Sequence, residues 1–171
     1  HTEKGFSLIE LIVAMTVMLV LLGLVSTILS GAVSMRSRES RKTDALSSSQ
    51  AALNVISREV ANSGYGLNYN GLIAADSGSQ KIRVRANLKN SNNCVTDSGE
   101  DVTYFYDATT QSIVRSERYA TTECGTAFQT KTSVVVNRIS NITFHYWDYS
   151  STNTSGTLTT LPTPNTGRVV I

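Results

Sequence analysis

The fold is decided by the stretch Lys4-Gly5-Phe6-Ser7-Leu8-Ile9-Glu10-Leu11-Ile12-Val13-Ala14-Met15, which opens a long apolar run that carries one acidic side chain. From Leu11 to Val25 the run contains a single hydroxyl, that of Thr16, and it stays mainly apolar to Met35. A helix of this length and composition can span a bilayer. A cleavable secretory signal has a shorter apolar core with a small-residue cleavage site beyond it. We therefore expect a membrane-spanning helix.

The helical pattern continues after Met35 into polar sequence, with no proline or glycine before Ser63. Apolar residues recur there at steps of three and four, which marks one face of a helix. Ser63 and Gly64 then supply a stop signal. We expect one helix over residues 6–62, whose second half lays its apolar stripe on a sheet. The stripe consists of Ala45, Leu46, Ala52, Leu53, Ile56 and Val60.

Beyond Gly66 the pattern changes to short runs with a period near two, which predicts strands between polar turns. We expect an antiparallel sheet of about four to six strands. Residues 107–111 have the composition of a hairpin loop, and residues 149–167 that of a long Ser/Thr/Asn/Pro-rich loop. The predicted strands lie at 81–85, 102–106, 112–115, 134–136, 142–147 and 168–171.

The two cysteines, Cys94 and Cys124, both lie in the polar part of the chain. If the apolar run crosses the cytoplasmic membrane, both thiols are on its oxidising side, where a disulfide persists. A Cys94–Cys124 bridge is therefore expected, with two buried thiols as the alternative. Two cysteines without nearby histidine pairs do not make a zinc site, which needs at least three protein ligands.

The charge balance argues against nucleic acid as a direct partner. The formal net charge is +2, whereas nucleic-acid binders gather Lys and Arg on one face. One small exception stands out, because Lys81, Arg83 and Arg85 alternate along a predicted strand and so share one of its faces. These three residues form a candidate basic contact face for DNA or another surface. The same row fits the solvated face of a sheet edge.

Glu10 is the decisive residue of the apolar run. A carboxylate near the centre of a membrane-spanning helix costs about 2.5–3.5 kcal/mol, and less near an interface. No lysine or arginine occurs between Lys4 and Arg36, so the run itself offers no partner. Cleavage after Gly5 would create an amine at Phe6, and the amine of one subunit could meet Glu10 of its neighbour and fix the register between them. Alternatively, Glu10 is solvated at the headgroup level.

The stretch from Lys4 to Met15 resembles the class III signal of type IV prepilins and of type II secretion pseudopilins, in which a Gly precedes Phe and a Glu follows four residues later. The resemblance implies an α+β pilin fold, with a long N-terminal helix packed on an antiparallel sheet. It also implies that prepilin peptidase cleaves between Gly5 and Phe6 and methylates the Phe6 amine.

A looser resemblance concerns the subfamily. Residues 51–66 are similar to the end of the long helix in PilW-like minor pilins and J-type pseudopilins. Residues 139–148 and the closing Arg-Val-Val-Ile are similar to the late strands of that family. The first proline is Pro162, whereas major pilins commonly carry one in the apolar helix. We therefore expect a minor pilin that primes or supports pilus assembly. The alternatives are a minor pseudopilin of a type II secretion system and a tip subunit that binds a surface or DNA.

An enzymatic function finds little support. The sequence has no Gly-rich phosphate loop, nucleophile elbow or paired histidine motif, and we expect no cofactor and no metal. Asp97, Glu100 and Asp101 cluster in a polar stretch, but their spacing matches no calcium-binding loop. We expect these three side chains to lie in a solvated loop.

The apolar run and the processing motif together predict the location, the partners and the segments of the chain. The domain should lie in the periplasm or outside the cell, anchored by one helix in the bacterial inner membrane until a surface or periplasmic filament incorporates it. The expected partners are prepilin peptidase, other minor and major pilins or pseudopilins, the inner-membrane assembly platform and membrane lipid. The expected segments are a leader remnant (1–5), a transmembrane and assembly helix (6–35), its amphipathic continuation (36–62) and a β-rich domain (63–171) truncated at its C-terminus.

Overall fold

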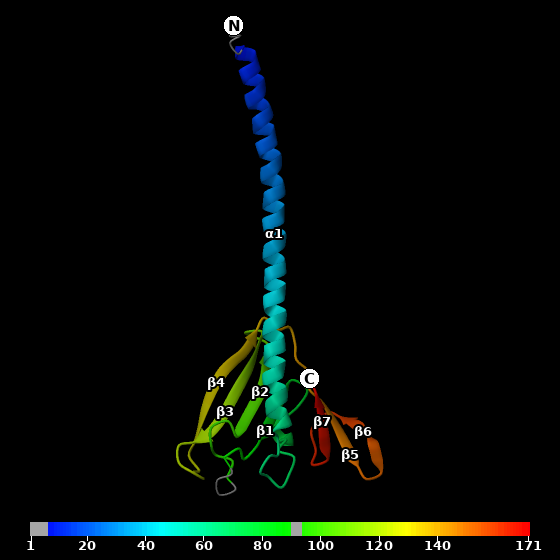
Figure 1. Cartoon of the computed structure of the whole chain (residues 1–171). Helices are drawn as coiled ribbons and strands as arrows, with labels where there is room; N and C mark the ends of the chain where they lie inside the picture. The colour runs from blue at the N-terminus through cyan, green and yellow to red at the C-terminus, as the bar shows by residue number, and fades with distance from the viewer. Residues whose placement is uncertain (1–6, 90–93) are drawn as a thin grey trace. The chain divides into compact units, whose positions relative to one another are not determined.

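One continuous helix, α1 (Leu8–Ala61), opens the computed structural model, which describes residues 7–89 and 94–171 (Figure 1). The expected single helix is confirmed from Leu8 onward, and Phe6 lies outside the described residues. The stop signal is confirmed at Gly64, where φ is +82°, a left-handed conformation that glycine adopts without strain. The Gly64 N–H donates to the Arg85 carbonyl at 2.9 Å, so the chain joins the first strand as the helix ends.

The chain divides into two compact units, His1–Leu46 and Ser47–Ile171. In the described part of the first unit every residue is helical or directly precedes the helix, and every side chain is exposed. The second unit contains the end of α1, a short 3-10 helix η1 (Ala74–Asp76) and, among the described residues, seven strands. This arrangement confirms the predicted α+β fold, in which a long N-terminal helix is packed with an antiparallel β domain.

The first sheet has the strand order β1-β2-β3-β4 and is antiparallel throughout. Asp107 pairs with Ser112, which confirms the predicted hairpin loop between β2 and β3. The strands are β1 (Lys81–Arg85), β2 (Asp101–Asp107), β3 (Ser112–Ala120) and β4 (Phe128–Asn137).

The second sheet corrects two expectations. Its order is β6-β5-β7, formed by β5 (His145–Ser150), β6 (Asn153–Thr159) and β7 (Thr166–Val170), so the described residues form two sheets instead of the one expected. The prediction of a loop over 149–167 is wrong, because all of β6 lies there, with the turn that joins it to β5. Threonine favours strands, and an edge strand such as β6 needs few apolar residues. Trp147 of β5 pairs with Leu158 of β6 and with Arg168 of β7.

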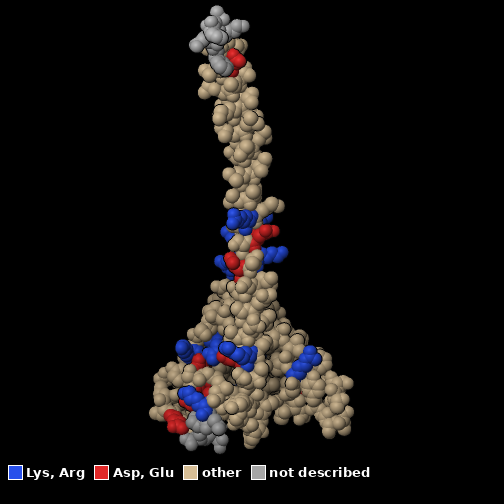
Figure 2. All heavy atoms as spheres, viewed as in Figure 1, with Lys and Arg blue, Asp and Glu red and all other residues tan. Residues whose placement is uncertain are grey.

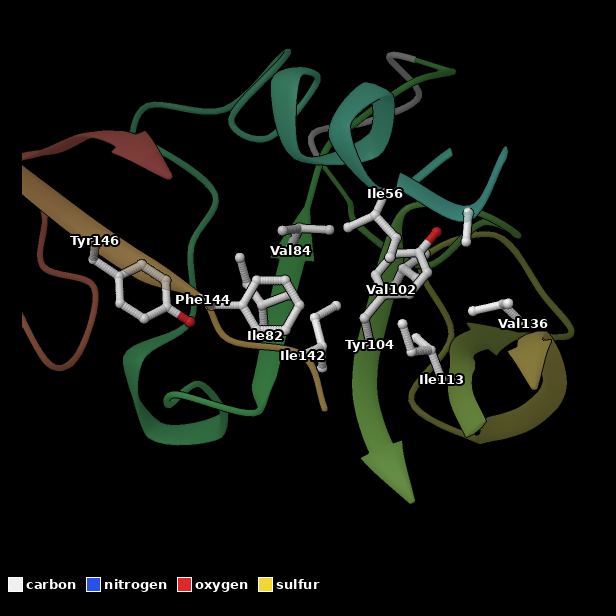
Figure 3. Close-up of a cluster of buried hydrophobic side chains, with 11 residues drawn as sticks. Ile56, Ile82, Val84, Val102, Tyr104, Ile113, Val136, Ile142, Phe144 and Tyr146 are labelled. Carbon is white, nitrogen blue, oxygen red and sulfur yellow. The ribbon is translucent and has the colours of Figure 1, made fainter. Parts of the chain in front are cut away.

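The hydrophobic core lies under the last turns of α1. Figure 3 shows Ile56 among side chains from the first sheet, and Ile56 is fully buried. Leu46 and Leu53 are 61% and 40% exposed, and Ala45 is exposed as well, so the expected apolar stripe is wrong at these three positions. The core comprises Ala52, Ile56, Ile82, Val84, Val102, Tyr104, Ile113, Val136, Ile142, Phe144 and Tyr146.

A disulfide joins Cys94 to Cys124, with their Cα atoms 5.4 Å apart, so neither is a free thiol. The bridge ties the segment that precedes β2 to the loop between β3 and β4. The Cys124 N–H also donates to the Thr96 hydroxyl at 3.2 Å. Closing a loop of 30 residues stabilises the folded state by about 3–4 kcal/mol, mainly by restricting the unfolded chain.

Candidate functional site

The N-terminal motif is described from Ser7 onward, and Gly5 and Phe6 lie outside the described residues. Glu10 is exposed in the first turn of α1. The carbonyl of Ser7 accepts hydrogen bonds from the N–H groups of Glu10 at 3.0 Å and Leu11 at 3.2 Å, which starts the helix. A carboxylate in the first turn interacts favourably with the helix dipole. Glu10 therefore sits where its charge is compatible with the helix and accessible to a partner.

The apolar part of α1 is long and apolar enough to cross a membrane. Figure 2 shows a helix stretch without charged side chains between one acidic group near its start and a belt of mixed charges; the sequence places the next charge after Glu10 at Arg36. Large apolar side chains along this stretch are exposed, as Leu29 is at 62%. They are available to lipid or to other helices.

Four hydroxyl groups within the apolar stretch donate hydrogen bonds to carbonyls of the helix itself. Thr16 donates to the Val13 carbonyl at 2.8 Å, and Ser26 donates to the Leu22 carbonyl at 2.8 Å. Thr27 and Ser34 also donate to carbonyls three residues earlier in the helix. Hydroxyls bonded in this way do not require water, which lowers the cost of placing them in an apolar environment. Glu10 is the one acidic or basic side chain in the described helix before Arg36.

A polar cluster connects the end of α1 to the first sheet, and we call Glu59, Tyr104, Arg115 and Glu117 the helix clamp. The Tyr104 hydroxyl donates to Glu59 Oε2 at 2.8 Å, and Arg115 Nε donates to Glu59 Oε1 at 3.1 Å. Arg115 Nη1 donates to Glu117 Oε2 at 2.7 Å. Glu117 also accepts from the Gly99 N–H at 2.9 Å and from the Ser98 hydroxyl. The clamp fixes the last helical turns on β2 and β3.

Burial and hydrogen bonding together shift the pKa values of Tyr104 and Glu117 in the clamp. Burial, together with the Glu59 carboxylate, raises the pKa of the Tyr104 hydroxyl. Burial alone would raise the pKa of Glu117, but the bonds from Ser98, Arg115 and Gly99 outweigh it and lower that pKa. Glu117 is thus held ionised beside the Arg115 guanidinium. Sequence reasoning missed this cluster, although Glu59 follows Ile56 by three residues on the packed face of the helix.

Lys81, Arg83 and Arg85 share one face of β1, as their alternation predicts, but they do not form an unpaired basic row. Arg83 donates to both oxygens of Asp101, at 2.7 and 2.6 Å, and also to Asp76. Arg85 Nε donates to Asp101 Oδ2 at 3.0 Å. Lys81 Nζ lies 3.7 Å from an Asp76 oxygen. The side chain of Arg83 is only 13% exposed, so the alternative expectation, that the row is the solvated face of a sheet edge, does not describe Arg83 either.

The expected solvated acidic loop is wrong for two of its three residues. Asp101 begins β2 and is 2% exposed beneath the arginines, and Glu100 is 1% exposed. Glu100 accepts backbone N–H bonds from Lys89 and Asp97, both at 3.1 Å. Within residues 7–89 and 94–171, no group of three His, Cys, Asp or Glu side chains is placed to hold a metal ion. These buried carboxylates instead organise the chain around them.

Residues 1–26 match the family model of the prokaryotic N-terminal methylation motif. No curated protein and no solved structure matches the chain. The motif supports membership of the type IV pilin-like group of proteins, and the observed fold is consistent with a pilin. Proteins with this motif are structural subunits, processed by prepilin peptidase and assembled with other pilins. The motif together with the exposed apolar helix fits a single-pass, membrane-anchored protein.

Proposed function

We propose that the chain is a minor subunit of a type IV pilus-like filament that primes or supports filament assembly. The observation that carries this proposal is the methylation motif at residues 1–26, which leads into 25 residues, Leu11 to Met35, without a single charge. In the membrane these side chains contact lipid. In a filament they contact the helices of neighbouring subunits, so assembly exchanges one apolar environment for another.

The chemistry of assembly centres on Gly5, Phe6 and Glu10. Cleavage after Gly5 leaves a methylated amine at Phe6, which carries a positive charge. Glu10 of a neighbouring subunit pairs with that amine, and a polar pair within an apolar bundle has one favourable axial position. The pair therefore sets the register between subunits, while the apolar side chains supply the contact area.

Two features support a minor role for the subunit. The described helix runs without interruption from Leu8 to Ala61, and the first proline of the chain is Pro162. The helix therefore lacks the proline that is common in the apolar segment of major pilins. We propose that residues 6–35 anchor the subunit in the inner membrane, residues 36–62 continue the helix and residues 63–171 form the extracytoplasmic domain.

Replacement of Glu10 tests the assembly role. Glu10→Ala should leave the extracytoplasmic domain folded and the Cys94–Cys124 bridge formed, while the number of assembled filaments falls sharply. Glu10→Gln keeps the shape but removes the charge, so it should fail in the same way. Glu39→Gln is the matched control, because Glu39 is an exposed helical carboxylate outside the apolar stretch. Normal filament numbers in Glu10→Ala would contradict the pairing of Glu10 with the Phe6 amine.

Co-purification distinguishes a pilus from a secretion pseudopilus. A minor pilin should be recovered with the major subunit of surface filaments after shearing of cells. A type II secretion pseudopilin should remain with the cell envelope and co-purify with secretion components, and that result would replace the pilus assignment.

A further inference from the structure

The outer face of the first sheet carries a shallow groove whose lining residues all lie outside the N-terminal motif and the apolar helix. On β1 and β2 the core side chains alternate with side chains that point to the opposite face. On that face, Phe105 pairs across the strands with Lys81 and Thr103 pairs with Ser116. The groove has a volume of about 440 Å³, and it is lined by Gln80, Lys81, Thr103, Phe105, Tyr106 and Ser116.

Beside this groove, an excess of positive charge surrounds one buried carboxylate. Asp101 Oδ2 lies 2.6 Å from Arg83, 3.0 Å from Arg85 and 3.9 Å from Arg118. Asp76 offsets part of this charge through Arg83 and Lys81. The connected network thus holds four basic and two acidic side chains, an excess of +2, equal to the formal excess of the whole chain.

The basic groups of the network differ in access to solvent. The Arg83 side chain, held by two aspartates, is 13% exposed, whereas Arg85 is 27%, Arg118 40% and Lys81 47% exposed. A guanidinium has five N–H donors, so the two oxygens of Asp101 cannot satisfy three of these groups. Asp101 therefore orients the arginines while leaving donors and net charge for a further anion.

We propose that this face binds an acidic saccharide, a sugar chain that carries carboxylates. Lys81 and the arginine network attract the carboxylate, and the Thr103 and Ser116 hydroxyls bond the sugar hydroxyls. The Phe105 ring offers an apolar surface to the sugar ring. A groove of this volume lies within the range of small-ligand sites. This inference adds a ligand to the subunit and is independent of whether the subunit is a pilin.

Two other anionic partners fit the face less well. Nucleic-acid binders draw much of their affinity from neutralising several phosphates, whereas the network has an excess of about two charges. An acidic peptide strand binds best to an exposed sheet edge, where backbone groups are unpaired. The groove instead lies over β2, which is hydrogen-bonded on both sides, to β1 and to β3. Side chains alone make the contacts here, which suits a saccharide.

Titration of the full chain in non-ionic detergent tests the proposal. The probes are tetramers of galacturonate, mannuronate and glucuronate, compared with the carboxyl-reduced form of each. At least one uronate should bind saturably by calorimetry, and its carboxyl-reduced form should bind at least about tenfold more weakly, as expected for loss of a charge-assisted hydrogen bond.

Variants locate the binding site. Lys81→Ala and Phe105→Ala replace side chains outside the core cluster, and each should weaken uronate binding by about tenfold. Lys131→Ala is the matched control, because Lys131 is an exposed lysine on β4 that does not line the groove, and it should bind as wild type does. Circular dichroism of each variant confirms that it is folded.

Three results would overturn the proposal. One is the absence of saturable binding by all three uronates at millimolar concentration. Another is equal binding of a uronate and its carboxyl-reduced form. The third is tighter binding of a single-stranded DNA oligomer than of any uronate, which would assign the face to nucleic acid.

Discussion

The two ends of α1 belong to one continuous helix, but their side chains have different surroundings. Before Arg36, the described side chains are exposed and, apart from Glu10 and a few hydroxyls, apolar, and the hydroxyls of residues such as Thr16 and Ser26 bond the helix's own carbonyls. After Leu46, Ala52 and Ile56 are buried. The first region thus depends on lipid or other subunits for its partners, whereas the second is stabilised by its own domain.

The largest expected effect on domain stability comes from a matched pair of alanine substitutions, one in the core and one in the exposed apolar part of α1. Ile56→Ala should lower the free energy of unfolding of the domain by about 3 kcal/mol, because Ile56 is fully buried in the core. Leu29→Ala removes a side chain of similar size from the apolar region, where Leu29 is 62% exposed. This substitution should change the free energy of unfolding by less than about 0.5 kcal/mol. Urea unfolding of the full chain in detergent, followed by Trp147 fluorescence, measures both. Equal changes in the free energy of unfolding for Ile56→Ala and Leu29→Ala would contradict the proposed difference between the two ends of α1.

The helix clamp should give the next largest effect. Arg115→Ala leaves Glu59 and Glu117 without their shared cation and should cost about 2–3 kcal/mol in the same unfolding measurement. Arg58→Ala is the matched control, since Arg58 is exposed on the same helical turn as Glu59, and it should cost less than about 0.5 kcal/mol. A cost for Arg115→Ala no larger than this would show that the clamp does not hold the helix.

A smaller effect is expected for a single hydrogen bond of the clamp. Tyr104→Phe keeps the ring in the core and removes only the hydroxyl that donates to Glu59. The expected cost is about 1 kcal/mol, the net value of one such bond. Tyr119→Phe removes a hydroxyl from an exposed bond at 3.2 Å to Gln129 and should have a smaller effect. The reverse order would contradict the assigned role of Tyr104.

The smallest expected effect is a pH dependence of domain stability through Glu117. Its folded-state pKa lies below the ordinary value of 4.5, so the folded protein binds this proton less readily than the unfolded chain. The contribution of Glu117 to the free energy of unfolding is therefore present above pH 4.5 and is lost as the pH falls through the lower folded-state pKa. Glu117→Gln should lose less stability than wild type between pH 5 and pH 3 in urea unfolding. An identical decline in both proteins would contradict the assignment.

Sequence reasoning was most successful where one residue type alternates regularly with another. Lys81 to Arg85 reads as a half-buried strand, and β1 has those bounds. It was least successful for polar edge strands. Most of β4 and all of β6 consist of exposed or half-exposed residues, many of them Thr and Ser, and β6 contains Gly156. Such strands are specified by their pairing with neighbours, which a local pattern does not contain.

The polar clusters were harder to predict, because their members lie far apart in the chain. Glu59 and Arg115 meet at 3.1 Å only after the helix packs on β3. The alternation of Lys81, Arg83 and Arg85 did indicate a shared face, but the burial of Asp101 beneath it could not be seen in a stretch that reads as a polar loop. By contrast, the Gly5-Phe6 and Glu10 motif is local and was recognisable directly.

The N-terminus of the protein recovered from cells tests the central claim most directly. Mass spectrometry of the chain, expressed together with prepilin peptidase and purified from membranes or sheared filaments, should find Phe6 as the first residue, heavier by one methyl group. The same chain from cells without the peptidase should retain the residues before Phe6. A chain that keeps Gly5 when the peptidase is present and active would contradict the assignment of a processed filament subunit.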